Sequence, residues 1–321
     1  MRQKTLLLLL LFVLLLQKSF SQTDIDGLMM QKNFFCIGPT AGYSSWTKYW
    51  EGTFKRDNAN LGRVSTTNYM FMGNYGITNR LNVLFGVPYV KTKASQGNLA
   101  GQKGLQDLSL FVKWAPHKPR KLWKGEFSTI LIGGYSTPLS NYTADFLPLS
   151  IGLHSKNFIF RLMGDYQVGN WTATASGSYI RRSNVTIDRY TYYTTEMHYT
   201  NEVKMPDAMN CNFRLGYRSE TWIAELVLDR WKTLGGFDIP KNGAPFVSNE
   251  MNATKLGINV KYETNFVDGL SFVANGSTTL KGRNVGQSTG FNAGVFYIFD
   301  LSKKKKKGKD AKKDKETKSK K

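Results

Sequence analysis

The sequence is poor in cysteine, proline and histidine, and each shortage excludes a class of protein. Two cysteines in 321 residues exclude a small domain held together by disulfides. The three histidines, His117, His154 and His198, form no cluster with metal-ligand spacing. No glycine-rich phosphate-binding loop occurs, so the sequence implies no cofactor. After Leu16 no run approaches roughly 18 apolar residues, which excludes a helical membrane protein.

The first 21 residues have the features of a secretory signal peptide. Arg2 and Lys4 precede an unbroken apolar run, Leu6–Leu16, which is too short to span a bilayer as a helix. The run is followed by Ser19-Phe20-Ser21, a cleavage site of the small-x-small kind. We therefore expect export and a mature chain that starts at Gln22.

The positive charge is concentrated at the carboxyl end of the chain. The formal net charge is +21, and residues 303–321 hold twelve lysines against three acidic residues. Such a like-charged segment predicts a disordered tail over 302–321. In the periplasm it could contact an anionic polymer of the envelope, or it could be a solvated tail with no specific partner. Export excludes a nucleic-acid partner.

The remaining chain alternates between apolar and polar residues with a period of two. In 207–218, Met209, Phe213 and Tyr217 share one face, whereas Asn210 and Arg214 share the other. Successive side chains of a strand point to opposite sides, so this pattern indicates a strand with one apolar and one polar face. Segments of this kind number twelve and lie near 46–56, 63–77, 81–92, 105–116, 123–136, 157–167, 169–182, 207–218, 220–232, 251–263, 268–281 and 289–301.

The lengths and connections of these segments are typical of a barrel in the outer membrane. Each segment has about ten to fourteen residues, whereas a tilted strand needs roughly 9–11 to cross a bilayer. Short connections alternate with long ones, as expected of periplasmic turns and extracellular loops. Backbone groups in lipid must pair internally, so the strands must close on themselves.

Tyrosine and tryptophan positions support the same interpretation, because amphipathic rings favour a lipid–water boundary. At the long-connection ends, Tyr89, Tyr135 and Tyr179 share the apolar face. An aromatic girdle is predicted on that face at the short-connection ends, from Tyr75, Trp114, Trp123, Tyr166, Trp171, Tyr217, Trp222 and Tyr262.

We therefore predict an all-β fold: a closed antiparallel transmembrane β-barrel of about 12 strands, with a soluble secreted β-protein as the alternative. The predicted organisation is a signal peptide at 1–21, an N-terminal segment at 22–45, the barrel at 46–301 and the tail at 302–321. Gly38-Pro39 interrupts the apolar residues of 22–45. This segment could cap the mouth of the barrel, plug the lumen or extend the first strand, and pairing of 34–44 with the barrel would give 14 strands.

The polar face supplies the candidate lining of the lumen. Its charges have both signs, so they could form an ion-pair network that fills a narrow barrel or a lining that sets selectivity. The candidates are Glu51, Lys55, Asp107, Lys113, Arg161, Asp165, Arg182, Arg214, Glu225, Asp229, Lys255, Lys261 and Glu263.

Catalysis has little support in the sequence, and we expect no enzyme and no catalytic residues. A lipid hydrolase would need a base beside a nucleophile, and His198 with Thr200 or Ser183 is the one conceivable set. A solvated loop histidine is the favoured interpretation. Cys211 lies on the apolar face, so we expect no disulfide with Cys36.

Two stretches resemble known sequence patterns. The final strand ends in Tyr297, Phe299 and Leu301, which resembles the carboxyl-terminal signature that the barrel assembly machinery recognises. Over 46–182 the chain resembles the outer-membrane barrel family named for the meta-pathway of phenol degradation. The runs that carry this resemblance are Tyr75-Gly76-Ile77-Thr78-Asn79-Arg80-Leu81, Val87-Pro88-Tyr89-Val90, Gly104-Leu105-Gln106-Asp107-Leu108-Ser109 and Val112-Lys113-Trp114.

The resemblance implies a porin-like channel or transporter for hydrophobic or aromatic compounds. We therefore expect a bacterial outer-membrane barrel that passes a small solute, with outer-membrane lipid around it and the loops at 93–104, 137–156 and 183–206 as a gate. The alternative is a plugged structural barrel whose lysine-rich tail tethers envelope components. The third interpretation is an enzyme that modifies membrane lipid.

Overall fold

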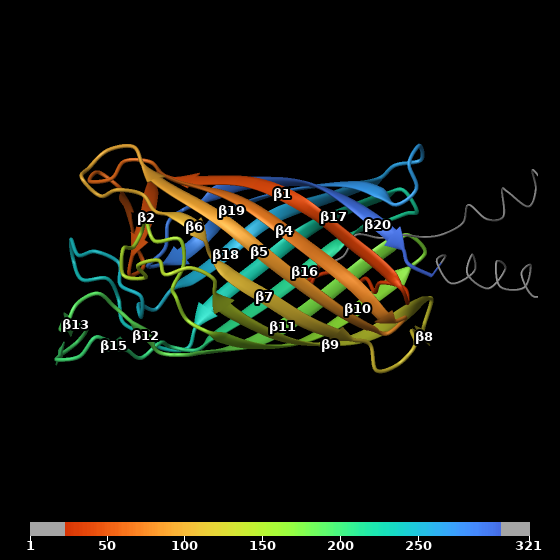
Figure 1. Cartoon of the computed structure of the whole chain (residues 1–321), viewed down its shortest axis with the longest axis horizontal. Helices are drawn as coiled ribbons and strands as arrows, with labels where there is room; N and C mark the ends of the chain where they lie inside the picture. The colour runs from red at the N-terminus through yellow and green to blue at the C-terminus, as the bar shows by residue number, and fades with distance from the viewer. Residues whose placement is uncertain (1–22, 303–321) are drawn as a thin grey trace, which may run out of the picture.

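Twelve long antiparallel strands form the wall of a closed barrel in the computed structural model, which describes residues 23–302 (Figure 1). Each strand pairs with its neighbours in chain order, and β1 pairs with β20 to close the sheet. The wall strands are β1 (Phe34–Trp46), β4 (Val64–Thr78), β5 (Leu81–Ala94), β7 (Asp107–Trp114), β9 (Gly125–Pro138), β10 (Asn157–Val168), β11 (Trp171–Arg182), β16 (Ala208–Arg218), β17 (Trp222–Thr233), β18 (Asn252–Glu263), β19 (Leu270–Arg283) and β20 (Thr289–Asp300).

Shorter strands belong to the connections between wall strands. Three hairpins stand apart from the barrel sheet, whereas β6 and β8 extend that sheet along β5 and β9. The short strands are β2 (Lys48–Glu51), β3 (Phe54–Asp57), β6 (Lys103–Leu105), β8 (Arg120–Leu122), β12 (Val185–Thr186), β13 (Tyr192–Tyr193), β14 (Met197–His198) and β15 (Glu202–Val203).

The predicted fold class is confirmed, but the predicted first strand is wrong. Of the predicted strand 46–56, only Trp46 belongs to the wall, whereas residues 48–57 form the separate hairpin β2–β3, whose turn includes Gly52 with a φ of 56°. The first wall strand is β1, which contains Gly38 and Pro39. The register of β1 with β20 skips these two residues, so the missing N–H of proline interrupts the sheet only locally. Because β1 takes the place of the predicted strand 46–56, the number of wall strands stays at twelve.

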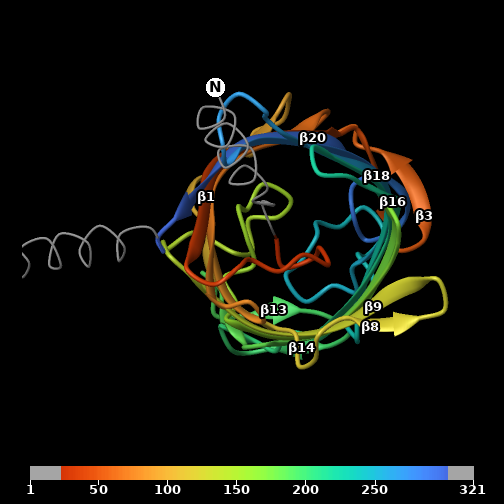
Figure 2. The ribbon, with the colours of Figure 1, turned by 90° about the vertical axis from the view of Figure 1, so that its right-hand side faces the viewer.

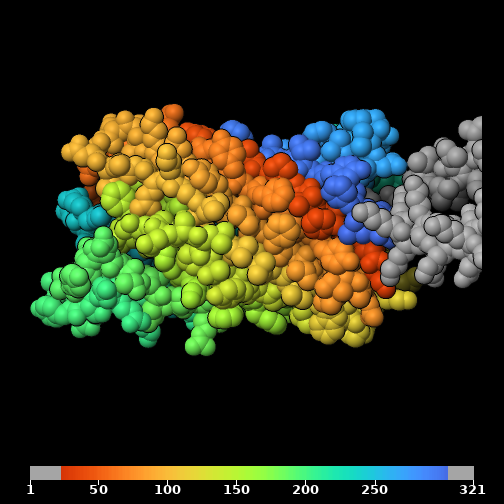
Figure 3. Space-filling model, in the orientation of Figure 1, coloured from red at the N-terminus to blue at the C-terminus, as the bar shows by residue number. Residues whose placement is uncertain are grey.

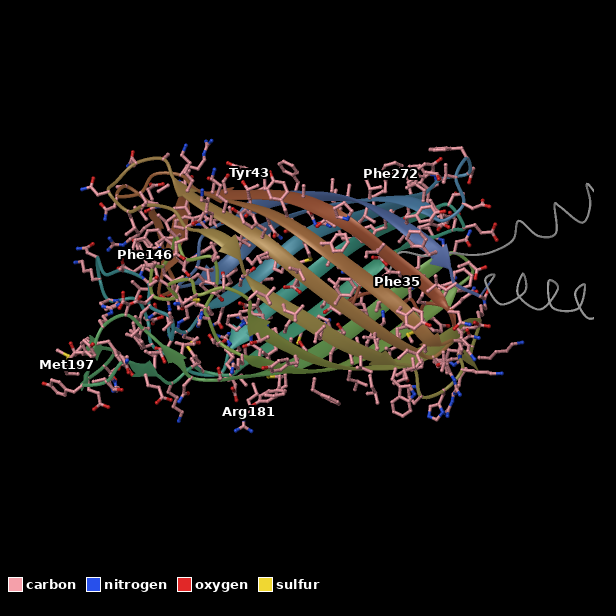
Figure 4. All side chains as sticks on the ribbon, in the orientation of Figure 1. Phe35, Tyr43, Phe146, Arg181, Met197 and Phe272 are labelled. Atoms are coloured by element: carbon pink, nitrogen blue, oxygen red, sulfur yellow. The ribbon has the colours of Figure 1, made fainter. Side chains whose placement is uncertain are left out.

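The two faces of the wall differ as the alternation predicts. In β16, Phe213, Leu215 and Tyr217 are exposed on the outside, whereas Asn212 and Arg214 are buried on the inside. Figure 4 shows Tyr43 and Phe272 projecting away from the barrel in the same manner. A continuous apolar outer face of this extent suits lipid rather than water.

The long connections gather at one end of the barrel and the short turns at the other. Loops 139–156, 183–207 and 234–251 share an apolar cluster that includes Val185, Tyr192 and Phe246. Viewed from the short-turn end, loop segments cross the far mouth (Figure 2). Figure 3 shows loop 183–207, in green, extending furthest beyond the wall. These loops therefore form one packed assembly.

The described residues contain no helix that is long and apolar enough to cross a membrane. The predicted signal peptide at 1–21 and the lysines of the predicted tail at 303–321 lie outside the described residues.

A charge placed on the outer face is expected to destabilise the barrel. Phe213 lies on the outer face near the middle of β16. Phe213→Arg places a guanidinium there and should lower the free energy of unfolding in lipid vesicles by about 2–4 kcal/mol. Asn275→Arg, at an inward and exposed position of β19, is the control and should change it much less. Guanidinium titration followed by tryptophan fluorescence measures both. Equal effects would contradict the assignment of the two faces.

Candidate functional site

The chain preceding β1 enters the lumen and is held there by buried cations of the wall. Lys113 of β7 is fully buried, and its Nζ donates to Oδ1 of Asp26 at 3.0 Å and to the Asp26 carbonyl oxygen at 2.7 Å. Arg161 of β10 donates from Nη1 to Oδ2 of Asp24 at 2.6 Å and to the Asp24 carbonyl oxygen at 2.9 Å. We call residues 23–33 the lumen segment. It runs inside the barrel outline in Figure 2, in red.

Backbone hydrogen bonds hold the lumen segment further along. Asn82 of β5 accepts from Met30 N at 3.2 Å and donates to the Met30 carbonyl oxygen at 3.0 Å. Asn79 accepts from Lys32 N at 2.8 Å. A side chain at Gly27 would collide with the Asp165 carboxylate, so this position needs glycine. The wall therefore contacts the segment over most of its length.

Apolar contacts also hold the lumen segment against the wall. Met30 packs in a buried cluster with Phe34, Cys36, Phe296 and Ile298. Its neighbour Met29 packs against a second buried cluster, which consists of Ala115, Ile130, Ile132 and Met163. These methionines fill lumen space between strands on different sides of the barrel.

Buried charged side chains of β10, β16 and β17 form a continuous network on the inner face of the wall, beside the lumen segment. We call Asp165, Arg218, Glu225 and Arg214 the charge chain. Arg218 donates from Nη1 to Oδ1 of Asp165 at 2.9 Å and from Nη2 to Oε1 of Glu225 at 3.0 Å. Glu225 also accepts from Nη1 of Arg214 at 2.9 Å and from Nδ2 of Asn259 at 3.2 Å. The four charged groups alternate in sign, so each carboxylate lies between donors and its desolvation is offset.

The other inward candidates of β17 and β18 lie close to this chain. Asp229 accepts from Nδ2 of both Asn210 and Asn212, at 2.9 and 3.0 Å. Lys261 and Glu263 form an ion pair at 3.6 Å. Lys255, by contrast, is exposed to the lumen, and we find no ion pair for it among the described residues.

Two inward candidates lie at the long-loop rim, where Arg182 contacts another wall strand and Asp107 binds a loop. The guanidinium of Arg182 lies over the Trp231 ring, 5.3 Å from its centroid. Asp107 accepts from the hydroxyl of Tyr142 at 2.6 Å, which ties loop 139–156 to β7. Burial and the hydrogen bond to Asp107 raise the pKa of the Tyr142 hydroxyl far above its ordinary value, so it remains a donor.

Glu51 and Lys55 do not belong to the lumen lining, and this part of the prediction is wrong. Both lie in the β2–β3 hairpin, outside the barrel sheet. Glu51 pairs with Arg56 at 3.3 Å, and Lys55 lies over the Trp50 ring at 5.5 Å. The cause is the hairpin turn at Gly52, which pairs 48–51 with 54–57 instead of with the wall.

Sequence reasoning missed three residues that organise the site. Arg218 shares the inward parity of Arg214, a signal that could have identified it. Asp24 and Asp26 lie outside any alternating segment, so nothing in their surroundings predicted that they pair with wall cations. Among residues 23–302, no group of three or more histidine, cysteine or acidic side chains could hold a metal ion.

Above the lumen segment lies a chamber of about 390 Å³ with two kinds of wall. Its charged side is formed by Arg214, Glu225, Asp229, Lys255 and Lys261 from β16–β18, with Asp24 and Asp26 from the lumen segment. A neighbouring side, from β4, β19 and β20, is formed by Met70, Met72, Val273 and Phe296 together with the polar side chains of Asn68, Asn275, Ser277 and Asn292. The chamber suits a small molecule with an apolar body and a polar group.

The structure places the candidate girdle residues on the outside at the short-turn end, except Trp123. That residue is almost fully exposed in the turn between β8 and β9, with a φ of 50°. Neighbouring strands bring girdle rings together: Trp171 and Tyr217 are 5.7 Å apart, and Trp222 and Tyr262 are 4.6 Å apart. The others, Tyr75, Trp114 and Tyr166, point outward from β4, β7 and β10.

The structure does not bring His198 to the nucleophiles considered for it. Its Nε2 lies 2.9 Å from Oγ1 of Thr194, and its ring stacks on Tyr192 at 4.7 Å. Ser183 donates instead to the Asn184 carbonyl oxygen, and Thr200 accepts from Glu202 N. Cys36, which is buried, and Cys211, which is exposed, form no disulfide with each other.

The fold is similar to that of solved outer-membrane proteins. A crystal structure of an outer-membrane channel from Pseudomonas putida F1 matches 87% of this chain and 100% of that chain, with a TM-score of 0.67 and 13% sequence identity. The KdgM porin matches 81% and 99% of the two chains, with a TM-score of 0.44 and 9% identity. No protein-family model matches the sequence, and no curated protein is similar to it. The first match shows the fold, and the resemblance to the phenol-degradation family stays a prediction.

Removal of Arg218 should destabilise the barrel strongly. Arg218→Met leaves Asp165 and Glu225 buried without their shared cation, and loss of one partner of a buried pair costs about 3–5 kcal/mol. Chemical unfolding of the folded protein in detergent measures the loss. Arg230→Met, an exposed outward residue of β17, is the control and should stay within about 0.5 kcal/mol of wild type. Similar effects of the two substitutions would refute the role of the charge chain.

Acid should release loop 234–251. Hydrogen bonds from Arg283, at 2.8 Å from both Nε and Nη2, and from Asn284 hold the pKa of Asp238 below its ordinary value of 3.8. A lowered carboxyl pKa stabilises the folded loop above that ordinary value, and this contribution is lost as the pH falls through the lowered pKa. The protection of the loop amides against hydrogen exchange, corrected for the intrinsic exchange rate at each pH, should therefore decrease below about pH 4. In Asp238→Asn the exchange of the loop should depend less on pH. The same pH dependence as in wild type would show that the contact of Asp238 with Arg283 and Asn284 does not hold the loop.

Proposed function

We propose that this protein is an outer-membrane channel for a small amphipathic solute and that the lumen segment is its inner gate. The observation that carries the proposal is the chamber beside the lumen segment, because charged, polar and apolar side chains of the wall line an open space there rather than a solid core. The fold match to an outer-membrane channel supports the location. The export signal and the aromatic positions predicted from the sequence agree with it.

The chemistry of the chamber suggests the class of solute. Met70, Val273 and Phe296 offer an apolar surface, and Lys255 of the adjacent strand β18 offers an exposed cation. A small aromatic or aliphatic molecule that carries a carboxylate or hydroxyl group meets both surfaces. This agrees with the hydrophobic or aromatic compounds that the family resemblance implies.

The gate rests on ion pairs that can be removed without leaving unpaired charges. Asp24 pairs with Arg161, and Asp26 pairs with Lys113. Neutralising one partner alone would leave the other charge buried, which is costly. Neutralising all four residues together removes the ionic attraction while it keeps polar side chains in place.

Loosening the lumen segment should open the channel. We expect the variant Asp24→Asn/Asp26→Asn/Lys113→Gln/Arg161→Gln to show larger or more frequent single-channel current steps than wild type in planar bilayers. The control Arg230→Gln/Lys232→Gln removes two exposed cations from the outside of β17 and should conduct as wild type does. Heat-modifiable migration on a gel shows that each sample is folded. A folded quadruple variant that passes no current would refute the channel and favour a structural barrel.

A further inference from the structure

Four exposed cations cluster on the outside of the barrel at the long-loop end of β4, β5 and β6. Lys91 and Lys93 follow Tyr89 on the outward face of β5, and Lys103 of β6 lies directly opposite Lys91. Arg63 precedes β4, and its carbonyl oxygen accepts from Ser95 N at 2.9 Å, which places it beside the end of β5. We call Arg63, Lys91, Lys93 and Lys103 the cation cluster.

The cation cluster has no counter-charge within the protein. None of its four members forms an ion pair with a carboxylate in the part of the chain that the structure describes. Elsewhere at this end Arg283 pairs with Asp238 and Glu250. Like charges directly opposite each other on one face of a sheet are destabilising. The pair Lys91–Lys103 therefore requires solvent or an external anion.

An apolar groove of about 780 Å³ begins directly below the cation cluster on the outer face. Its floor is a row of three alanines from adjacent strands, because Ala41 of β1 pairs with Ala293 of β20, and Ala293 pairs with Ala274 of β19. Larger side chains stand around this floor. They include Tyr69, Phe71, Val87, Tyr89, Leu105, Tyr262 and Phe272.

The groove and the cation cluster are continuous. Tyr89 and Leu105 line the groove, and each lies two residues from a lysine of the cluster on the same face. Two residues of a strand span about 7 Å. A bound molecule could therefore place an anionic group on Lys91 and Lys103 while its apolar part enters the groove.

We propose that this surface binds a phosphorylated, acylated glycolipid of the lipid A type from the outer leaflet. Its phosphates would lie on the cation cluster, and an acyl chain would lie over the alanine floor. The cluster extends over three neighbouring strands, about 10 Å, which suits a headgroup with more than one phosphate. The inference rests on the proposed outer-membrane location, in which the long loops face outward.

Native mass spectrometry of the folded protein in detergent, with lipid A added and divalent cations removed, tests the proposal. Lys91→Ser/Lys103→Ser should weaken binding of bis-phosphorylated lipid A by about 10- to 30-fold. The reason is that each lysine near an anionic lipid group contributes appreciably to the free energy of binding. The matched control is Arg230→Ser/Lys232→Ser, which removes two outward cations of β17 and should bind as wild type does. Ala293→Phe fills the groove floor and should also weaken binding, although it changes no charge.

Three outcomes would overturn the proposal. They are equal loss in the lysine variant and its control, equal binding of dephosphorylated lipid A or phosphatidylglycerol, and a dimer that forms through the groove instead of a lipid complex. The experiment reports on the outer face, whereas conductance reports on the lumen. A conducting barrel without lipid A binding would thus refute this inference alone, and a silent barrel that binds lipid A would refute the gated channel alone.

Discussion

The constraint on which the structure depends is that no backbone group facing lipid can remain unpaired. It requires the sheet to close, and pairing of β1 with β20 achieves this. Closure in turn fixes the inside of the wall as the place for polar side chains, because every strand alternates between lipid and lumen. The charges that the sequence places on these strands must then be neutralised within a narrow space.

Neutralisation is achieved in two ways, and the difference between them matters for function. Around Arg218 the wall provides its own partners, Asp165 and Glu225, so this part of the lumen is fixed. Lys113 and Arg161 instead depend on Asp26 and Asp24 of the lumen segment. The first arrangement links wall strands to one another, whereas the second links the wall to the lumen segment, the proposed gate. The chamber lies where the two arrangements meet.

The fold could be predicted from the sequence because the period-two pattern is a local property of each strand. Eleven of the predicted segments correspond to wall strands with ends shifted by a few residues. The prediction failed over 34–56, where the aromatic alternation around Trp50 occurs in a hairpin and Pro39 sits inside a wall strand. The partners within the lumen were not predictable in this way. Asp26 and Lys113 are 87 residues apart, and no local pattern relates them.

The lumen segment is joined to the wall at Asn33, whose backbone bonds to both Gly76 and Leu301 next to the seam of the barrel. In the proposed gate, a blocker attached in this way is present at a fixed, high effective concentration, whatever the abundance of the protein. Its release and return are unimolecular events, so dilution cannot remove it and no other molecule can substitute for it by mass action alone. Under the proposed gating, the fraction of open barrels depends on the combined strength of two ion pairs, the hydrogen bonds from Asn79 and Asn82, and the methionine contacts.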